Sequence, residues 1–367
     1  MTQDNWSVPE TEVVQRIRDR LDADGTDVLA TVVDVDGNAY RRPGAKMLLD
    51  EGGTGVGSIT AGCLEDELVR VGERVRETGR PELVTYDLME DDEDNVWGLG
   101  VGCNGVIEVL LEPLTDAYRP AVEAFFDGRD VAVVTVLDGD DTGFEQGDRV
   151  YYYPDSGTFD APSGPDVGDW PTGALSDSAG ELTERGRAGT LSVGYGAAEL
   201  DVFVDGLAAP TELVVFGTGH DVRPVTELAA NVDFRVTVVG FRGAVDLAER
   251  FPAADRTVTT SPARVAEGLA LDDRTHAVVM THNFVDDRLT VEALLDAGVP
   301  YVGLMGPRER FEEMQAAGGG SPYKIAHSIV AEALAVANDR TPRHLKAREG
   351  PIHERVDVDS DADLPPQ

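Results

Sequence analysis

Apolar positions in the first third of the chain alternate between helical and strand-like spacing. A helix is predicted over residues 1–20, with Val13, Val14 and Ile17 at helical spacing. A second helix is predicted from Cys63 onward, because four apolar residues share one of its faces: Leu64, Leu68, Val71 and Val75. Short apolar runs predict strands at residues 28–35, 45–49, 82–87 and 106–111.

The middle of the chain carries a weaker pattern. Apolar runs predict a helix at residues 118–126 and strands at 131–137, 149–153 and 191–204. Residues 138–190 are rich in Gly, Asp, Pro and Ser, and only one of these strands falls within them. We interpret this segment as an elaboration, and residues 205–211, with Pro210, as a linker.

Strands and helices alternate regularly in the second half of the chain. Strands are predicted at residues 213–216, 235–239, 276–280 and 301–304. Helices are predicted from about Asp221, from Gly243, over residues 286–297 and over residues 322–337. The last of these carries an apolar face of Ile325, Ile329, Ala333 and Leu334. This alternation is typical of a parallel sheet with right-handed crossovers.

The expected fold is therefore α/β with two domains. An N-terminal mixed α/β domain spans residues 1–206, and a Rossmann-like, doubly wound parallel sheet domain spans residues 207–340. Residues 341–367 are charged and contain Pro, which favours a disordered acidic tail.

Charge narrows the classes of partner. The chain has 69 Asp and Glu against 31 Lys and Arg, a formal net charge of −38. Nucleic-acid backbones and anionic membranes both require clustered basic residues, so neither is an expected partner. The acidic residues are spread along the whole chain, which favours a halophilic, salt-adapted surface. With no apolar run of spanning length and no signal pattern, the expected localisation is cytoplasmic.

The chain has two cysteines, Cys63 and Cys103. This count excludes a four-Cys zinc site, makes a disulfide framework improbable, and leaves no expected metal centre. Gly57, Ser58 and Gly62 lead into a helix whose first turn holds Cys63, where the helix dipole favours a thiolate. The acids at positions 65–67 oppose that effect, so an inert buried thiol stays an equal alternative.

A second glycine-rich loop precedes the strand at residue 106. It spans Gly98–Gly105, includes Gly100 and Gly102, and surrounds Cys103 with residues that allow close backbone approach to a ligand. We therefore expect Cys103 rather than Cys63 to meet a bound cofactor. The segment Tyr40–Met47 holds three cations, Arg42 among them, which favours an anion site over a solvated turn.

The second domain adds candidates at the carboxyl ends of its strands. Gly217 and Gly219 lie between a strand and a helix, where backbone N–H groups bind phosphate. A packing turn is the alternative, and the second strand ends in Gly240 where an NAD-binding fold usually has an acid. His220 and His282 leave two strands at this edge and could form an acid/base pair. Asn283 follows the second histidine, and Gly306 with Arg308 follows the next strand, where the arginine could supply a cation.

Taken together, these motifs resemble the xanthine dehydrogenase accessory factor family, XdhC/CoxI. The resemblance lies in seven motifs in the same order: Arg42–Ala45, Gly57–Glu65, Gly98–Cys103, Val215–His220, Met280–Asn283, Gly303–Gly306 and Ile325–Glu332. It implies an N-terminal XdhC/CoxI domain, a C-terminal Rossmann-like domain, and a cofactor chaperone rather than a turnover enzyme.

The resemblance also implies a cofactor, partners and site residues. The cofactor would be molybdenum cofactor, transiently bound, with a cysteine desulfurase assisting its sulfuration and a molybdenum hydroxylase as the client; a homodimer is a further expectation. The implied catalytic residues are Cys103, Cys63, His282 and His220. The implied cofactor-binding residues are Arg42, Gly57, Ser58, Gly62, Glu65, Gly100, Gly102, Gly217, Gly219, Asn283, Gly306 and Arg308. Two alternatives stay open: an NAD(P)-dependent oxidoreductase with redox-active cysteines, and a nucleotide-sensing regulator without chemistry.

Overall fold

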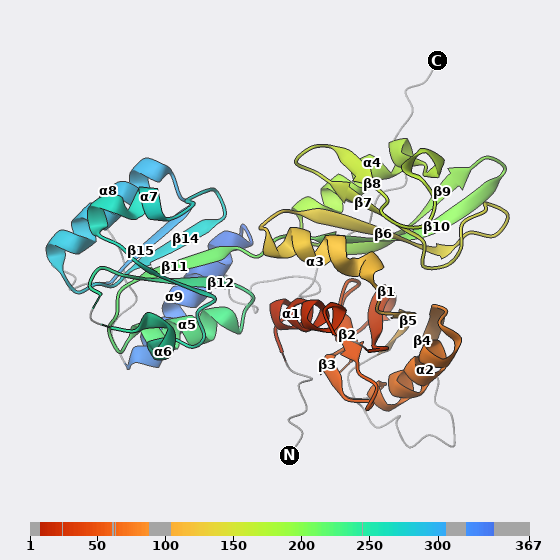
Figure 1. Cartoon of the computed structure of the whole chain (residues 1–367), viewed down its shortest axis with the longest axis horizontal. Coiled ribbons are helices and arrows are strands. Elements are labelled where there is room, and N and C mark those ends of the chain that lie inside the picture. The colour runs from red at the N-terminus through yellow and green to blue at the C-terminus, as the bar shows by residue number, and fades with distance from the viewer. Residues whose placement is uncertain are drawn as a thin grey trace. The chain divides into compact units, whose positions relative to one another are not determined.

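A computed structural model of the chain describes residues 8–23, 25–60, 62, 64–87, 104–243, 245–305 and 321–340. The chain divides into two compact units, one made largely of residues up to Glu212 and the other beginning at Leu213 (Figure 1). None of the described helices is both long and apolar enough to cross a membrane.

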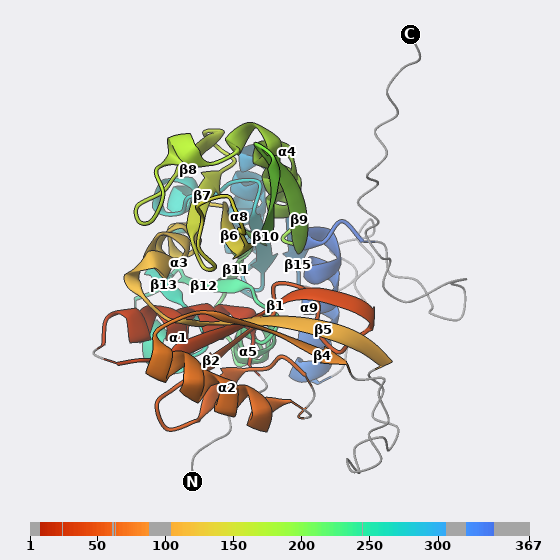
Figure 2. The same ribbon diagram turned by 90° about the vertical axis from the view of Figure 1, so that its right-hand side faces the viewer.

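The first unit begins with a module of seven elements, residues 10–113, here called the first module. Its elements are α1 (Glu10–Leu21), β1 (Val28–Asn38), β2 (Lys46–Leu49), β3 (Gly55–Gly57), α2 (Glu65–Thr78), β4 (Glu82–Asp87) and β5 (Asn104–Pro113). The strands form an antiparallel sheet in the order β3-β2-β1-β5-β4. Helix α2 packs on one face of this sheet through the apolar face predicted from the sequence (Figure 2).

A second module, residues 119–207, repeats this plan. Its elements are α3 (Arg119–Phe126), β6 (Val131–Asp138), β7 (Arg149–Tyr153), β8 (Thr158–Asp160), α4 (Thr172–Glu184), β9 (Ala188–Tyr195) and β10 (Ala198–Leu207). Its sheet has the order β8-β7-β6-β10-β9, the first module's order with every strand replaced by its counterpart. Helix α4 packs on this sheet as α2 does on the first.

The strand registers match residue by residue. Thr31 of β1 pairs with Lys46 of β2, and Thr135 of β6 pairs with Arg149 of β7. In both modules the pairing of the central strand with its other neighbour skips one residue, between Val32 and Asp34 in β1 and between Val136 and Asp138 in β6. A shared strand order with a shared β-bulge indicates that the first unit is an internal duplication.

The inner faces of the two modules pack on each other and bury α1 and α3 between them. One apolar cluster combines α1, α3 and both sheets, with Ile17, Leu29, Val122 and Tyr151 among its members. A smaller cluster joins Val33 and Leu110 of the first sheet to their counterparts in the second, Leu137 and Phe203. The core of the first unit is therefore continuous across both modules.

Residues 138–190 are thus not an elaboration, and that prediction is wrong. They hold β7, β8, α4 and the first residues of β9, all parts of the second module. The run 191–204, expected as one strand, belongs to the hairpin of β9 and β10, which turns at Gly196 with φ +65°. Strand β8 escaped prediction because Phe159 is its one apolar residue, so no alternating pattern arises.

The second unit is a parallel five-stranded sheet with helices on both faces. Its elements are β11 (Glu212–Phe216), α5 (Val222–Ala230), β12 (Arg235–Gly240), α6 (Leu247–Arg250), β13 (Arg256–Thr259), α7 (Val265–Gly268), β14 (Thr275–Val279), α8 (Phe284–Ala297), β15 (Tyr301–Leu304) and α9 (Pro322–Ala337). The strand order β13-β12-β11-β14-β15 places the switch in strand order between β11 and β14. Helices α7 and α8 cover one face (Figure 1).

The predicted α/β class, with a mixed N-terminal part and a C-terminal Rossmann-like parallel sheet, is confirmed. Two elements of the second unit, β13 and α7, were not predicted, since each has four residues and too few of them are apolar to form a pattern: RTVT in β13 and VAEG in α7. Helix α6 is also four residues long, shorter than the expected helix from Gly243. In α9 the buried residues are Ala326, Val330 and Ala333, while Leu334 of the predicted face is exposed.

Candidate functional site

The first module gathers its loops at one end of its sheet. Strands β1 and β3 end there and β2 begins there, so residues 39–45 and the described residues that follow β3 (58–60, 62 and 64) lie at the same edge. Strand β4 ends and β5 begins at this edge too, because Asn38 pairs with Asn104 and Asp87 with Val106. We call it the loop edge. The antiparallel topology thus brings together motifs that are far apart in the sequence.

Gly57 and Glu65 shape the loop between β3 and α2. Gly57 has φ +88°, and a Cβ there would lie 2.5 Å from the carbonyl oxygen of Lys46, so only glycine fits. Glu65 is 1% exposed and accepts hydrogen bonds from the Thr60 hydroxyl at 2.8 Å and the Leu64 N–H at 3.0 Å. Its carboxylate therefore closes the loop on itself and is not free for a ligand.

Of the two adjacent arginines, Arg41 contacts this loop, and no contact of the predicted Arg42 with it is described. The Arg41 guanidinium donates to the hydroxyl of buried Ser58 at 2.9 Å, and its Nε is buried without a hydrogen-bond partner. Arg42 is exposed, and Gly62, with φ +111°, is exposed within the loop. Sequence spacing could not separate the two arginines, because adjacent residues of an extended chain point to opposite sides and no local signal says which side carries the loop.

The third cation of the predicted cluster, Lys46, has a structural partner. Its Nζ lies 2.6 Å from Asp205 Oδ2, with both side chains about nine-tenths buried. Burial alone would lower the pKa of Lys46, but the Asp205 carboxylate outweighs it and raises this pKa above its usual value. Lys46 is therefore charged and paired, and contributes no free cation to the loop edge.

Six predicted site residues lie outside the described residues: Cys63, Gly100, Gly102, Cys103, Gly306 and Arg308. Cys63 precedes Leu64, at the start of α2, and Cys103 precedes β5.

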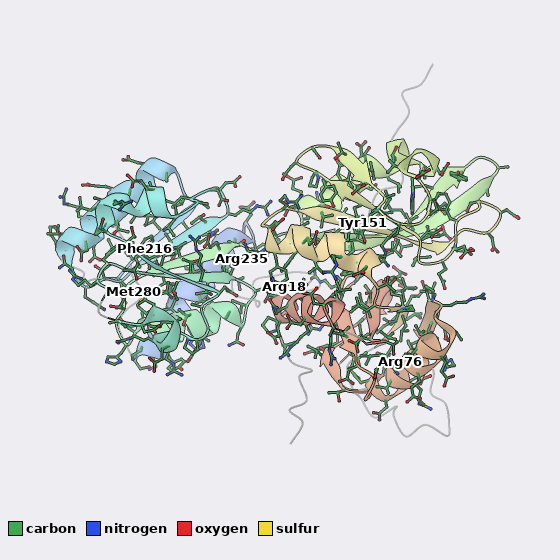
Figure 3. The ribbon with its side chains drawn as sticks, viewed as in Figure 1. Arg18, Arg76, Tyr151, Phe216, Arg235 and Met280 are labelled. Carbon is green, nitrogen blue, oxygen red and sulfur yellow. The ribbon has the colours of Figure 1, made fainter. Side chains whose placement is uncertain are left out.

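In the second unit the carboxyl ends of β11 and β14 meet at the point where the strand order switches. We call this the switch-point edge. The Met280 N–H donates to the Phe216 carbonyl oxygen at 2.8 Å, and Figure 3 labels both residues. A Cβ at Gly217 would lie 2.5 Å from the Met280 carbonyl oxygen, so a side chain at this position would displace backbone. Backbone packing therefore requires glycine at position 217, independently of any ligand.

His282 has a partner at this edge that sequence reasoning missed. Its Nε2 lies 2.8 Å from Asp221 Oδ2, whereas the expected partner, His220, is exposed with no hydrogen bond to His282 among the described contacts. The His282 backbone has φ +59°, an uncommon conformation for a residue with a side chain. Asp221 is 61 positions away in sequence, and the one signal for it was its place between the Gly217–Gly219 turn and the following helix.

Two neighbouring side chains hold the loop after β14 in place. Asn283, predicted to bind cofactor, caps α8 by accepting from the Val285 and Asp286 N–H groups at 3.0 and 3.1 Å. Asp287 is buried and accepts from the Thr281 hydroxyl at 2.5 Å. The amide oxygen of Asn283 is thus engaged in helix capping. The described residues contain no group of three or more His, Cys, Asp or Glu side chains placed to hold a metal ion.

Comparison with known proteins gives matches along nearly the whole chain. A Bacillus subtilis (strain 168) protein named as a probable xanthine dehydrogenase subunit is 28% identical over 330 residues, which cover 84% of this chain and 92% of that protein. A crystal structure described as a xanthine dehydrogenase from Bacillus halodurans has a TM-score of 0.69 and 26% identity, and the match covers 91% of this chain and 97% of that one.

Two family models match in the order that the sequence motifs predict. The XdhC and CoxI family model matches residues 11–87, and the XdhC Rossmann domain model matches residues 213–318. The first match contains the loop between β3 and α2, and the second contains both glycines of the switch-point edge and His282. The predicted resemblance is confirmed: both domains of the XdhC and CoxI family are matched, in the predicted order.

Proposed function

We propose that this protein is an accessory protein in the maturation of a xanthine dehydrogenase- or CO dehydrogenase-like molybdenum hydroxylase. The observation that carries the proposal is the pairing of both family domains in one chain, matched almost end to end by a relative whose name assigns it to xanthine dehydrogenase. The client enzyme is the expected partner.

The cargo of this accessory protein, in our proposal, is molybdenum cofactor, an anionic pterin phosphate with sulfur ligands. The loop edge of the first module fits an anion. Arg41 is anchored to Ser58 there and keeps a buried Nε without a partner, and Gly62, in the same loop as Ser58, is exposed. A guanidinium N–H that lacks an acceptor is satisfied when a phosphate oxygen supplies one.

The proposal extends to cofactor sulfuration. A cysteine desulfurase would supply the sulfur, and the protein would hold the cofactor during transfer and release it to the client. Cys103 and Cys63 both adjoin the loop edge in sequence, and we propose that one of these thiols meets the cargo. The protein itself would bind and position the cofactor without turning it over.

Coexpression with the client tests the role. A molybdenum hydroxylase produced with this protein should have higher activity per molybdenum than the same enzyme produced alone. Equal activity per molybdenum in both preparations would reject the accessory role.

The cargo site has a matched pair of variants. Arg41→Gln removes the anchored guanidinium, and Arg42→Gln removes the exposed one next to it. We expect Arg41→Gln to lower the pterin carried by the purified protein and Arg42→Gln to leave it near the wild-type amount. Equal loss in both variants would show that general positive charge, and not the Arg41–Ser58 arrangement, holds the cargo.

A further inference from the structure

The switch-point edge carries a negative charge where a Rossmann unit normally binds pyrophosphate. In such a unit the pyrophosphate lies at the N-terminus of the helix after the first strand. Here Asp221 immediately precedes α5, and its carboxylate packs against Gly219 so closely that a Cβ at Gly219 would overlap Asp221 Oδ1. A dinucleotide would bring two phosphate charges against this carboxylate.

The residues at the position where a dinucleotide's ribose would bind also differ from those of a usual dinucleotide site. An acid at the end of the second strand usually binds the ribose, and an arginine nearby accepts a 2′-phosphate. Gly240 ends β12 here, and a Cβ at this position would already lie 3.2 Å from the Thr218 methyl group. Arg242 donates to Asp286 at 2.8 Å, so an acid already neutralises the arginine that could accept a 2′-phosphate. The acid that usually binds the NAD ribose is absent from the end of β12.

The group that this edge does present is the imidazole of His282, which is 54% exposed. An ionised carboxylate can only accept a hydrogen bond, so the contact with Asp221 Oδ2 places the proton on His282 Nε2. The neutral ring then offers Nδ1 as an acceptor. Asp221 Oδ1 is buried without a hydrogen-bond partner. Among the described residues, His282 is therefore the one side chain that hydrogen-bonds to this carboxylate. Phe284, two residues further and 58% exposed, adds an aromatic ring at the same edge.

We propose that the switch-point edge binds an uncharged heterocycle, through a hydrogen bond from a ring N–H of the ligand to His282 Nδ1, and does not bind a dinucleotide. Asp221 is a positioning residue: it holds the tautomer and orientation of His282. Two observations carry the proposal, the His282–Asp221 contact made from a left-handed backbone and the carboxylate in the place of the pyrophosphate.

A pterin ring has N–H groups of this kind, and so does guanine. The choice of pterin as the natural ligand rests on the proposed function, since it is the uncharged end of the proposed cargo. Guanosine serves as the second probe because it has the same aminopyrimidinone edge without belonging to the molybdenum cofactor. The two probes separate the chemistry of the edge from the identity of the cargo.

Calorimetry on the full chain tests the ligand class with pterin, guanosine, NADH and NADPH. We expect at least one of the two heterocycles to bind and neither dinucleotide to do so. His282→Asn should weaken heterocycle binding by about tenfold or more, as expected for loss of one buried hydrogen bond to a ligand. Asparagine tolerates positive φ, so the backbone is retained. His327→Asn, at an exposed histidine on α9, is the matched control and should bind as wild type.

Asp221→Asn tests the positioning role with a spectroscopic readout. In wild type, nitrogen NMR of the imidazoles should show His282 protonated at Nε2 only. The variant should show a mixture of tautomers with the fold intact, and its heterocycle affinity should fall less than that of His282→Asn. An unchanged tautomer in Asp221→Asn would overturn the positioning role.

Other results of these experiments also test the proposal. Binding of NADH or NADPH by wild type, binding of neither heterocycle, or equal affinities in His282→Asn and His327→Asn would each overturn the proposal. If wild type and His282→Asn carry the same amount of cofactor on purification, the proposed function stands and this inference fails. If wild type carries no cofactor but binds guanosine through His282, the inference stands and the proposed cargo is wrong.

Discussion

At the scale of single residues, one backbone contact governs the carboxyl edge of the parallel sheet. Gly217 must lack a side chain because a Cβ would lie 2.5 Å from the Met280 carbonyl oxygen. Gly217→Val should therefore destabilise the second unit itself by at least about 2 kcal/mol, since overpacking against backbone cannot relax through a rotamer change. Denaturant unfolding should show this loss; a fully stable Gly217→Val that has lost only ligand binding would contradict it.

Buried tyrosines give the protein a dependence on alkaline pH. Burial raises the pKa of Tyr86 to about 12, above its value in the unfolded chain. The folded state therefore keeps the phenol proton between about pH 10 and about pH 12 while the unfolded chain releases it, so stability falls as pH rises through this window. Below about pH 10 the contribution is fully present.

Tyr86→Phe tests that assignment. The Tyr86 hydroxyl is buried without a hydrogen-bond partner, so its removal should change stability at pH ~7 by no more than about 1 kcal/mol. The variant should lose less stability than wild type when urea unfolding is repeated at rising pH. Parallel losses in the two proteins would assign the alkaline sensitivity to other groups, such as Tyr151.

The residues of the candidate site could be predicted from the sequence only in part. Gly57, Ser58 and Gly217 were found because a glycine-rich turn between a strand and a helix is a local pattern. Asp221 was missed because its role comes from a contact with His282 that only the folded sheet creates. Glu65 was singled out as a cofactor-binding residue, and nothing local indicated that its carboxylate turns back onto Thr60.

At the scale of elements, the duplicated modules are joined by two equivalent buried ion pairs. Lys46 of β2 pairs with Asp205 of β10, and its counterpart Arg149 of β7 pairs with Glu112 of β5. The strand registers make these positions equivalent, because Asp205 and Glu112 each pair two residues before the matching threonine, at Val133 and Leu29. Each pair therefore crosses from one module to the other.

Removing one partner of either pair should be costly. Lys46→Met leaves Asp205 buried without its counterion and should lower the free energy of unfolding by about 3–5 kcal/mol. Lys46→Met with Asp205→Leu should recover most of that loss, because two apolar side chains replace the pair. Arg149→Met and its double variant with Glu112→Leu should behave alike. A double variant as unstable as the single one would refute the pairing.

The duplication is visible in the sequence as a short similarity between the two central strands, which is too short to predict it. Residues 30–34 read Ala-Thr-Val-Val-Asp and residues 134–138 read Val-Thr-Val-Leu-Asp, and both belong to the central strands. The remaining elements diverged: α2 buries Leu68, Val71 and Val75, whereas α4 buries Leu175, Ala179 and Thr183. Regular strands of the second unit were predictable because buried parallel strands are continuous apolar runs.

At the scale of the whole molecule, the net charge of −38 should make stability depend on salt. Repulsion among like charges disfavours the compact state, and added salt screens it. Thermal unfolding in ~2 M KCl should therefore occur at a higher temperature than in ~0.1 M KCl. A melting temperature that is equal or lower in the higher salt would contradict the salt-adapted interpretation of the acidic surface.

The two family-model matches, together with an anchored arginine at the loop edge, support our central proposal that the protein carries molybdenum cofactor to a client hydroxylase. The most direct measurement is purification from a molybdenum-replete host, followed by pterin fluorescence and metal analysis of the same sample. The account predicts pterin and molybdenum in the wild-type protein and less of both in Arg41→Gln. Repeated preparations with neither, which also take up no cofactor when it is offered, would contradict it.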